Sequence, residues 1–271
     1  IGGNAGRRGY PDGGLAYDLL PSVTRKIVCR PLARLYPLLH HQNVALRSAF
    51  LDQQVTAACE RAATTSAASA TSADSPQQTT VVVLGAGFDL RSLRLDTPAA
   101  RSCRWVEIDL PHVIEQRTRL LGRLARRRPE LTTLIDEVTS QGANLSLATQ
   151  VTSTLQASLR GSRDGVGGEA SGAARSGGTA IFVFEALLIY IEPAAAAALL
   201  ASCTTEAASA GFSHATLCFA DRLPDSPGFG FEEARTVLRS AGFELDEATW
   251  LPKPGLARHM GVAEAELRAE E

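Results

Sequence analysis

The feature that most limits the fold of this 271-residue chain is an apolar run that leads directly into two glycines, Val81-Val-Val-Leu-Gly-Ala-Gly87. A continuous β-branched run is typical of a strand that is buried on both faces of a parallel sheet. Glycines at the end of such a strand let the backbone turn tightly, and a ligand can approach because no Cβ is in the way. The segment therefore predicts a strand that ends in a ligand-binding turn or, alternatively, in a plain strand-to-helix turn.

Further strands and helices alternate along the chain. Strands are predicted at 103–110, within 180–191, at 215–220 and at 243–251, and helices are predicted from Pro111 to about Arg127, from Pro193 onward and at 231–241. Strands that alternate with helices predict a mainly parallel, doubly wound α/β sheet. Residues 18–59 are predicted to be largely helical with breaks at Pro31 and Pro37, and 263–271 has an acidic helical pattern.

Two segments contain few large apolar residues. Residues 62–78 are rich in Ala, Ser and Thr, and 161–178 are rich in Gly and Ser. Neither segment can bury enough apolar surface to offset its ordering entropy, so both are predicted to be loops or disordered. The predicted organisation is an N-terminal helical cap at 1–60, a low-complexity linker at 61–79, and a ligand-binding core at 80–271 with a disordered loop near 161–178.

The second predicted strand ends in acidic residues, in the segment Trp105-Val-Glu-Ile-Asp-Leu110. In Rossmann-like sheets an acid about 20 residues after the glycines accepts hydrogen bonds from both ribose hydroxyls. Asp109 lies nearer the carboxyl end of the strand and is the predicted ribose ligand. Glu107 is equally well interpreted as a ligand or as an acid that is exposed or forms a local ion pair.

The residues after the glycines distinguish between two adenosine cofactors. The dinucleotide fingerprint requires a third glycine where this chain has Leu90, and Asp89 would repel a pyrophosphate. S-adenosylmethionine (SAM) has no phosphate to place at a helix N-terminus. The pattern therefore predicts SAM as the cofactor and argues against NAD.

Composition argues against several other classes of function. The net charge is −2 and no apolar run approaches the length of a membrane span, so neither nucleic acid nor a membrane is expected as a partner. The five cysteines have no CxxC spacing and the five histidines are scattered, so no metal site is predicted and a cytoplasmic protein with reduced thiols is expected. The arginines between 117 and 128 are interpreted as a solvated helix face.

With these residues identified, the chain resembles the leucine carboxyl methyltransferase family, also called protein phosphatase methyltransferases. The matching stretches are Asn43-Val-Ala-Leu-Arg-Ser48 with Asp52, Leu84-Gly-Ala-Gly-Phe-Asp-Leu-Arg91 with Arg94-Leu95, Val106-Glu-Ile-Asp-Leu-Pro111, Gly142-Ala-Asn-Leu145, and Phe184-Glu-Ala-Leu-Leu-Ile-Tyr190 with Glu192-Pro193. The resemblance implies the α/β fold of a Rossmann-like class I SAM-dependent methyltransferase, with a doubly wound, mostly parallel sheet and an N-terminal helical cap.

The resemblance also implies roles for six residues. Arg47 would bind the SAM carboxylate, Gly85 would belong to the glycine motif, and Asp109 would bind ribose. Asn144 and Leu145 would contact adenine, and Glu185 would lie near the methionine part of SAM. A buried charge such as that of Glu185 in an apolar strand is costly unless it is paired, which favours a functional role.

Three departures from the family pattern concern the cofactor and the acceptor. Asn144 replaces an aspartate, and the family's Tyr-Glu-Gln segment reads Phe219-Ala-Asp221, in a region that shapes the acceptor pocket. The last strands of the fold are expected to be missing or shortened. Tyr190 is expected to pack in the core with its hydroxyl satisfied.

The implied reaction is methyl transfer from SAM to the C-terminal leucine carboxylate of a type 2A protein phosphatase catalytic subunit. Since a C-terminal carboxyl has a pKa of about 3.5, it is already ionised and needs no general base. No catalytic residue is therefore predicted. Two alternatives remain, which are a small-molecule O-methyltransferase of the same fold and a catalytically silent SAM-binding scaffold protein.

Overall fold

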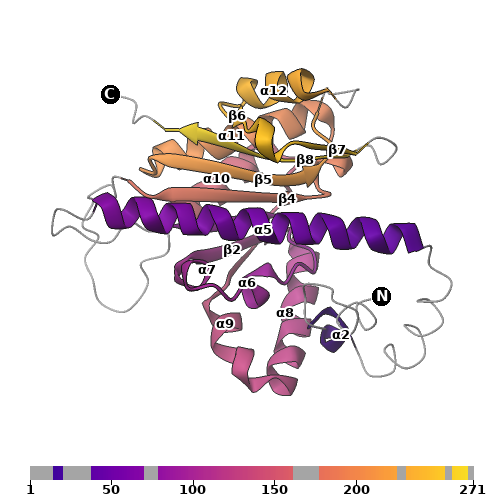
Figure 1. The fold of residues 1–271 in the computed structure, drawn as a ribbon. Helices are drawn as coiled ribbons and strands as arrows, with labels where there is room; N and C mark the ends of the chain where they lie inside the picture. The colour runs from indigo at the N-terminus through magenta and orange to yellow at the C-terminus, as the bar shows by residue number, and fades with distance from the viewer. Residues whose placement is uncertain are drawn as a thin grey trace.

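The structure is a computed structural model that describes residues 15–20, 38–69, 79–160, 177–224, 230–253 and 258–267. Its centre is one mixed sheet with the strand order β3-β2-β1-β4-β5-β8-β6, and β7 also pairs with β8 (Figure 1). The strands are β1 (Thr80–Leu84), β2 (Arg104–Asp109), β3 (Thr139–Gly142), β4 (Thr179–Glu185), β5 (His214–Asp221), β6 (Glu244–Leu245), β7 (Leu251–Lys253) and β8 (Arg258–Glu266). The first five strands pair in parallel, and β8 runs antiparallel to β5.

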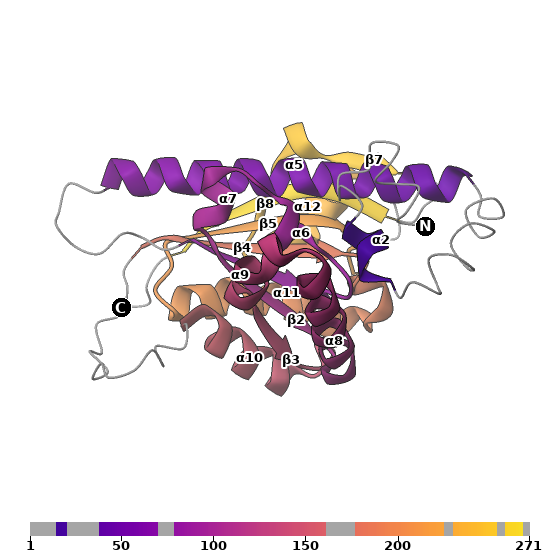
Figure 2. The same ribbon diagram turned by 90° about the horizontal axis from the view of Figure 1, so that it is seen from below.

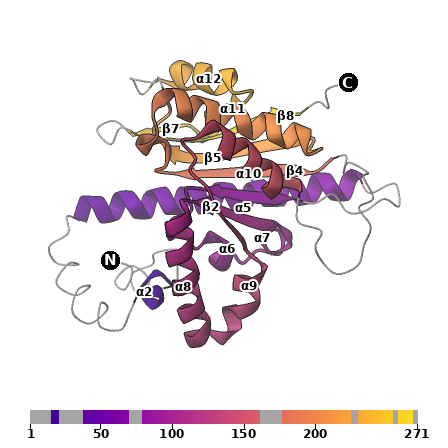
Figure 3. The ribbon, with the colours of Figure 1, turned by 180° about the vertical axis from the view of Figure 1, so that it is seen from behind.

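Helices cover both faces of the sheet. They are α2 (Leu15–Leu19), α5 (Leu38–Ser69), α6 (Arg91–Arg94), α7 (Pro98–Ser102), α8 (Pro111–Arg127), α9 (Thr132–Glu137), α10 (Ala148–Arg160), α11 (Pro193–Ser209) and α12 (Phe231–Ser240). The long helix α5 crosses one face, and α10 and α11 lie on the opposite face (Figures 2 and 3). These two layers explain why β1 is buried along its whole length, as the continuous apolar run predicted.

The core consists of two apolar clusters separated by the sheet. Alternate side chains of β1 point to opposite faces, so Val82 and Leu84 pack with α10 and α11 whereas Val81 and Val83 pack with α5. A third cluster joins α2, α6 and α8. The predicted α/β fold with a doubly wound, mostly parallel sheet is confirmed.

The sequence predicted several element boundaries closely. Pro111 and Pro193 each occupy the first turn of a helix, where a missing N–H costs no hydrogen bond. Gly242, just beyond α12, has a φ of +83°, a conformation that favours glycine at the end of a helix. Of the segment predicted to be a disordered loop, 161–176 lie outside the described residues.

The prediction of a loop at 62–78 is wrong for its first part, because α5 continues to Ser69. Alanine is the best helix former, and adding residues to an existing helix is easier than starting one. Thr64 and Thr65 donate hydrogen bonds to the carbonyl oxygens of Glu60 and Arg61, one turn earlier. Residues 70–78, like the predicted helix breaks at Pro31 and Pro37, lie outside the described residues.

The C-terminal prediction of a helix at 263–271 is wrong for the residues that the structure describes. β8 pairs with β5 from Asp221↔His259 to His214↔Glu266, so the expectation that the last strands are missing is wrong for this strand. Met260 and Val262 pack on the α5 side of the sheet, and Ala263 packs on the other side. Pairing with β5 outweighs the helix propensity of alanine and glutamate, because propensity is a weak prior.

Two smaller differences concern strands. The predicted strand at 243–251 is interrupted after β6 by a 3₁₀ turn at Glu247–Thr249, where the Asp246 carboxylate accepts a hydrogen bond from the Ala248 N–H. The edge strand β3 was not predicted, because its sequence Thr-Ser-Gln-Gly has no apolar run.

The arginines at 117–128 do not all lie on a solvated face. Arg117 is 1% exposed and its Nε donates to Glu107 Oε2 at 2.6 Å, while its Nη1 donates to the Gly87 carbonyl oxygen at 3.1 Å. Ser92 also donates to Glu107, at 2.8 Å. Glu107 is therefore the local ion-pair partner that the sequence left as one possibility. Burial raises the pKa of Glu107, although Arg117 opposes that shift.

We expect Arg117→Met to lower the free energy of unfolding by about 3–5 kcal/mol, because it leaves the Glu107 carboxylate buried without its cation. Urea denaturation at neutral pH measures this loss. The matched control is Arg119→Met on the same helix, where the pair with Glu115 is exposed and the effect is expected to be small. Equal losses of unfolding free energy in the two variants would show that the buried pair stabilises the fold no more than the exposed pair does.

Candidate functional site

The candidate site lies where the strand order reverses. β1 pairs with β2 on one side and with β4 on the other, and the register places Leu84 beside both Ile108 and Phe184. In open α/β sheets, ligands bind outside the carboxyl ends of the strands at such a switch point. Gly85 and Glu185, which follow these paired residues, are therefore at the position where a ligand is expected.

The glycine turn has the geometry that its sequence indicates. Gly85 and Gly87 have φ values of +69° and +46°, in the region that favours glycine. The Gly85 and Ala86 N–H groups both donate to the Ile108 carbonyl oxygen. A Cβ at Gly85 would lie 2.9 Å from Cδ1 of Leu187, so close packing as well as backbone conformation requires a glycine here.

Asp109 holds this turn in place. Its Oδ2 accepts a hydrogen bond from the Gly87 N–H at 2.7 Å, and its Oδ1 accepts one from the Leu110 N–H at 2.6 Å. Each carboxylate oxygen has a second lone pair available for a further donor. The residue therefore has a structural task and retains the capacity for the predicted ribose contacts.

The predicted adenine-binding segment lies beside Asp109. The Ala143 N–H donates to the Asp109 carbonyl oxygen at 2.8 Å, which places Asn144 and Leu145 next to the end of β2. The Asn144 side-chain oxygen accepts a hydrogen bond from the Ser146 N–H at 3.0 Å, so its amide has a defined orientation. Leu145 is 5% exposed and packs in the core cluster on the α10 side.

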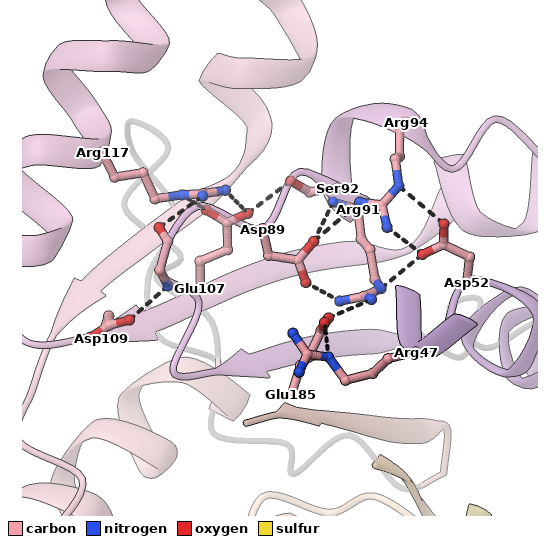
Figure 4. Close-up of polar contacts among 11 residues, drawn as sticks. Arg47, Asp52, Asp89, Arg91, Ser92, Arg94, Glu107, Asp109, Arg117 and Glu185 are labelled. Carbon is pink, nitrogen blue, oxygen red and sulfur yellow. Dashed lines mark hydrogen bonds and ion pairs between the residues drawn. The ribbon is translucent and has the colours of Figure 1, made fainter. Parts of the chain in front are cut away.

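A network of ion pairs joins α5, the glycine turn and the end of β4 (Figure 4). Arg47 Nε donates to Glu185 Oε1 at 2.5 Å, and Arg91 Nη2 donates to Glu185 Oε2 at 2.6 Å. Arg91 Nε also donates to Asp52 at 2.9 Å, and Arg91 contacts Asp89. The structure thus brings the predicted residues Arg47 and Glu185 into direct contact.

Arg94 completes the network through Asp52 and Asp89. The six side chains comprise three arginines and three acids, so their charges balance. Burial raises the pKa of Asp89, but Arg91 and Arg94 outweigh burial and hold that pKa below its usual value. The sequence contained Asp52, Arg91 and Arg94 within its motifs without indicating that they meet; the three-residue spacing of the two arginines after the turn is the only local signal.

Within this network Arg47 differs from Arg91. Arg91 is 1% exposed and uses its nitrogens on Asp52, Asp89 and Glu185. Arg47 donates only from Nε, and its two terminal nitrogens have no hydrogen-bond partner among the described residues. Its side chain is 18% exposed. Within the part of the chain that the structure describes, Arg47 therefore leaves two charged donors for a ligand, directly beside a carboxylate.

A second set of contacts fixes the loops after β4 and β5. Asp221 is fully buried, and its carboxylate accepts hydrogen bonds from the backbone N–H groups of Leu187, Leu188, Ile189 and Arg222. Ala186, which precedes these residues, has a φ of +55°. Such a conformation is costly for a residue other than glycine and persists only where the surroundings impose it. Asp221 was not predicted as a site residue.

The prediction that Tyr190, which follows this loop, packs in the core is wrong. Its side chain is 77% exposed, not packed in the core, because the 3₁₀ turn at Leu188–Tyr190 directs Leu188 inward instead. Tyr190 and Arg222 both line a cavity of about 650 Å³ at the ends of β4 and β5.

In the part of the chain that the structure describes, no three His, Cys, Asp or Glu side chains are grouped so that they could hold a metal ion. None of the helices in the described ranges has the length and apolar content that a membrane crossing requires.

The leucine carboxyl methyltransferase family model matches residues 15–204, well over half of the chain. No curated protein matches the chain in sequence. Three solved structures have weak similarity to the chain. LepI in complex with SAM is 11% identical with a TM-score of 0.41, and the match covers 77% of this chain and 46% of that chain. An O-methyltransferase family protein from Burkholderia thailandensis is 12% identical with a TM-score of 0.42 (71% of this chain, 52% of that chain), and the magnesium protoporphyrin IX methyltransferase from Synechocystis with bound SAM is 14% identical with a TM-score of 0.41 (84% of this chain, 83% of that chain). The chain thus spans about half the length of the first two proteins.

Asp221 predicts a pH-dependent contribution to stability. Burial raises its pKa to about 6, although the four N–H groups oppose that shift. Between about pH 4 and 6 the folded chain therefore binds more protons at Asp221 than the unfolded chain does, so this contribution is complete at the lower pH and is lost as the pH rises.

Urea denaturation of the wild type and of Asp221→Asn from pH 4 to 7 measures the effect. Relative to the variant, the wild type is expected to lose roughly 2–3 kcal/mol across this range, because one pKa unit corresponds to about 1.4 kcal/mol. A difference that stays constant with pH would contradict the raised pKa.

Proposed function

The chain belongs to the leucine carboxyl methyltransferase family, and on this premise we propose that it transfers the methyl group of SAM to a carboxylate oxygen of its acceptor. This membership confirms the resemblance seen in the sequence. The cofactor of the family is SAM, and the α/β sheet described above is that of a class I SAM-dependent methyltransferase.

The observation that carries the proposal is the pairing of Arg47 with Glu185. The methionine part of SAM carries a carboxylate and an ammonium group on one carbon atom. Arg47 offers two terminal nitrogens to a carboxylate, and the adjacent Glu185 oxygens retain lone pairs for an ammonium group. Adjacent charges of opposite sign at a topological switch point fit this end of the cofactor.

The other predicted contacts follow the edge of the sheet toward β3. Asp109 would accept hydrogen bonds from the ribose hydroxyls while it holds Gly87. Asn144 would accept from the adenine amino group through the second lone pair of Oδ1. Gly85 permits the backbone conformation of the turn, and Leu145 supports the segment from the core. The residues that we propose for the methionine, ribose and adenine parts of SAM thus follow one another along the edge of the sheet from β4 to β3.

The proposed chemistry requires positioning more than proton transfer. When bound, SAM supplies a methyl group on a positively charged sulfur, which a carboxylate oxygen attacks in line. An acceptor carboxyl is ionised at neutral pH, so no side chain has to remove a proton. The task of the chain is to hold both reactants and to exclude water, and good positioning alone can contribute roughly 7–11 kcal/mol. We assign no general base.

We further propose that the acceptor is a protein C-terminal leucine carboxylate, such as that of a type 2A protein phosphatase catalytic subunit. This acceptor is supported by family membership alone. The small-molecule acceptor and the silent SAM-binding scaffold are therefore distinguished by experiment below.

For the cofactor, we expect Arg47→Ala to weaken SAM binding roughly 10- to 100-fold, since hydrogen bonds to charged groups contribute about 1.5–3 kcal/mol. Arg47→Lys is also expected to bind SAM more weakly, because lysine has no planar fork. Isothermal titration calorimetry measures both. Arg61→Ala is the matched control, because Arg61 lies on the same helix in an exposed pair with Glu264. If folded Arg47→Ala bound SAM as tightly as the wild type does, Arg47 would not be a SAM ligand.

For the acceptor, we expect methyl incorporation into a phosphatase C-terminal peptide that ends in a free leucine carboxylate. The same peptide with an amidated terminus should not react, because amidation removes the attacking oxygen and keeps the side chain. Mass spectrometry detects the product, and the new ester should be base-labile. Equal incorporation into both peptides would contradict carboxyl methylation, and none into either, with SAM bound, would favour a small-molecule acceptor or the silent scaffold.

A further inference from the structure

The cavity at the ends of β4 and β5 lies next to the candidate cofactor site. One wall is the 3₁₀ turn Leu188–Tyr190 with the start of α11, and the other is the segment that follows β5. The turn begins three residues after Glu185, and Leu187 packs against the position of Gly85. The volume of about 650 Å³ lies within the range of small-ligand sites, about 300–1,000 Å³. The cavity and the candidate cofactor site are therefore connected through the short segment from Glu185 to Leu188.

Most of the residues that line the cavity are apolar. They include Leu188, Ile189, Ile191 and Leu223, together with Pro193, Ala196 and Pro224. Ile189 is 41% exposed, so it is available to a ligand. The charged side chains in the lining are Arg222 and Glu192, and these two do not form an ion pair with each other.

Arg222 is the cation of this cavity. Its side chain is exposed and has no ion-pair partner among the described residues, whereas most of the arginines near the cofactor site are paired with acids. Its backbone N–H is held by the Asp221 carboxylate at 2.8 Å. The same carboxylate holds the N–H groups of Leu188 and Ile189, so one buried group fixes both walls of the cavity. The Asp221 carboxylate thus fixes the position of the backbone that carries Arg222.

We propose that Arg222 binds the carboxylate that is to be methylated, and that the apolar wall of the cavity binds the side chain beside that carboxylate. This inference rests on the proposed function and assigns a residue of this chain to acceptor specificity. A guanidinium group can hold one carboxylate oxygen and leave the other to attack the methyl group. The acceptor class is an apolar amino-acid residue with a free α-carboxylate, present as a peptide C-terminus or as a free amino acid.

Glu192 limits the charge that the cavity accepts. A single carboxylate can pair with Arg222, but a dianion such as a phosphate monoester would also face the Glu192 carboxylate. Two like charges in one cavity disfavour each other. The cavity therefore favours a monoanion, as expected for a terminal carboxylate.

The test measures binding directly, so that it does not depend on turnover. Fluorescence anisotropy follows a labelled peptide ending in a free leucine carboxylate, with S-adenosylhomocysteine present to occupy the cofactor site. We expect the free-acid peptide to bind the wild type at least tenfold more tightly than its amidated form. Arg222→Gln should remove this preference, and Arg222→Lys should keep part of it because the charge remains. Unlabelled leucine as a competitor shows whether a free amino acid is also accepted.

Glu192→Gln is the matched control in the same cavity. Because it removes the opposing charge, it should bind the free-acid peptide at least as tightly as the wild type does, whereas a general disturbance of the cavity would weaken binding in both variants. Equal binding of the free-acid peptide by Arg222→Gln and the wild type would overturn the inference, and so would a wild type that does not distinguish acid from amide. Methyl transfer is measured separately, so acid-selective binding without transfer contradicts the proposed function and leaves the role of Arg222 intact.

Discussion

The arrangement of the candidate site depends on Arg91. Its buried guanidinium group contacts Asp52 on α5, Asp89 in the glycine turn and Glu185 at the end of β4. Burial lowers the pKa of Arg91, but these three acids outweigh burial and raise it, so the group stays charged. A buried charge is tolerated only while its partners remain in place, and removal of one partner is strongly destabilising. A helix, a turn and a strand end are therefore held in one relative position.

Carboxylates at the carboxyl edge of the sheet hold backbone in the same way at three places. Asp109 at the end of β2 holds the Gly87 N–H, Asp89 accepts from the Arg91 N–H, and Asp221 at the end of β5 holds the loop after β4. Each bond satisfies a backbone donor that regular secondary structure leaves unpaired, either after a strand or at the start of a helix. The chain itself thus holds the backbone at this edge of the sheet, and pre-organisation of this kind reduces the ordering cost of binding.

The family match covers one part of this edge of the sheet but not the other. The cofactor side carries the motifs of the leucine carboxyl methyltransferase family, to which the chain belongs. The family match ends at residue 204, before Asp221, which fixes the cavity walls, and Arg222, which presents a positive charge to the cavity. In the proposed reaction the cofactor supplies the electrophile, and the cavity contributes the positioning of the acceptor.

The sequence by itself determined the features that depend on neighbouring residues. The apolar run before Gly85 predicted β1 and its turn, and the prolines at 111 and 193 predicted where two helices begin. Tertiary structure decided what depends on distant partners. Asp52 and Glu185 meet Arg91 across 39 and 94 residues of sequence, and the buried Arg117 pairs with Glu107 and Gly87. The segment at 258–266 is a strand because β5 offers an unpaired edge, which outweighs its local helix propensity.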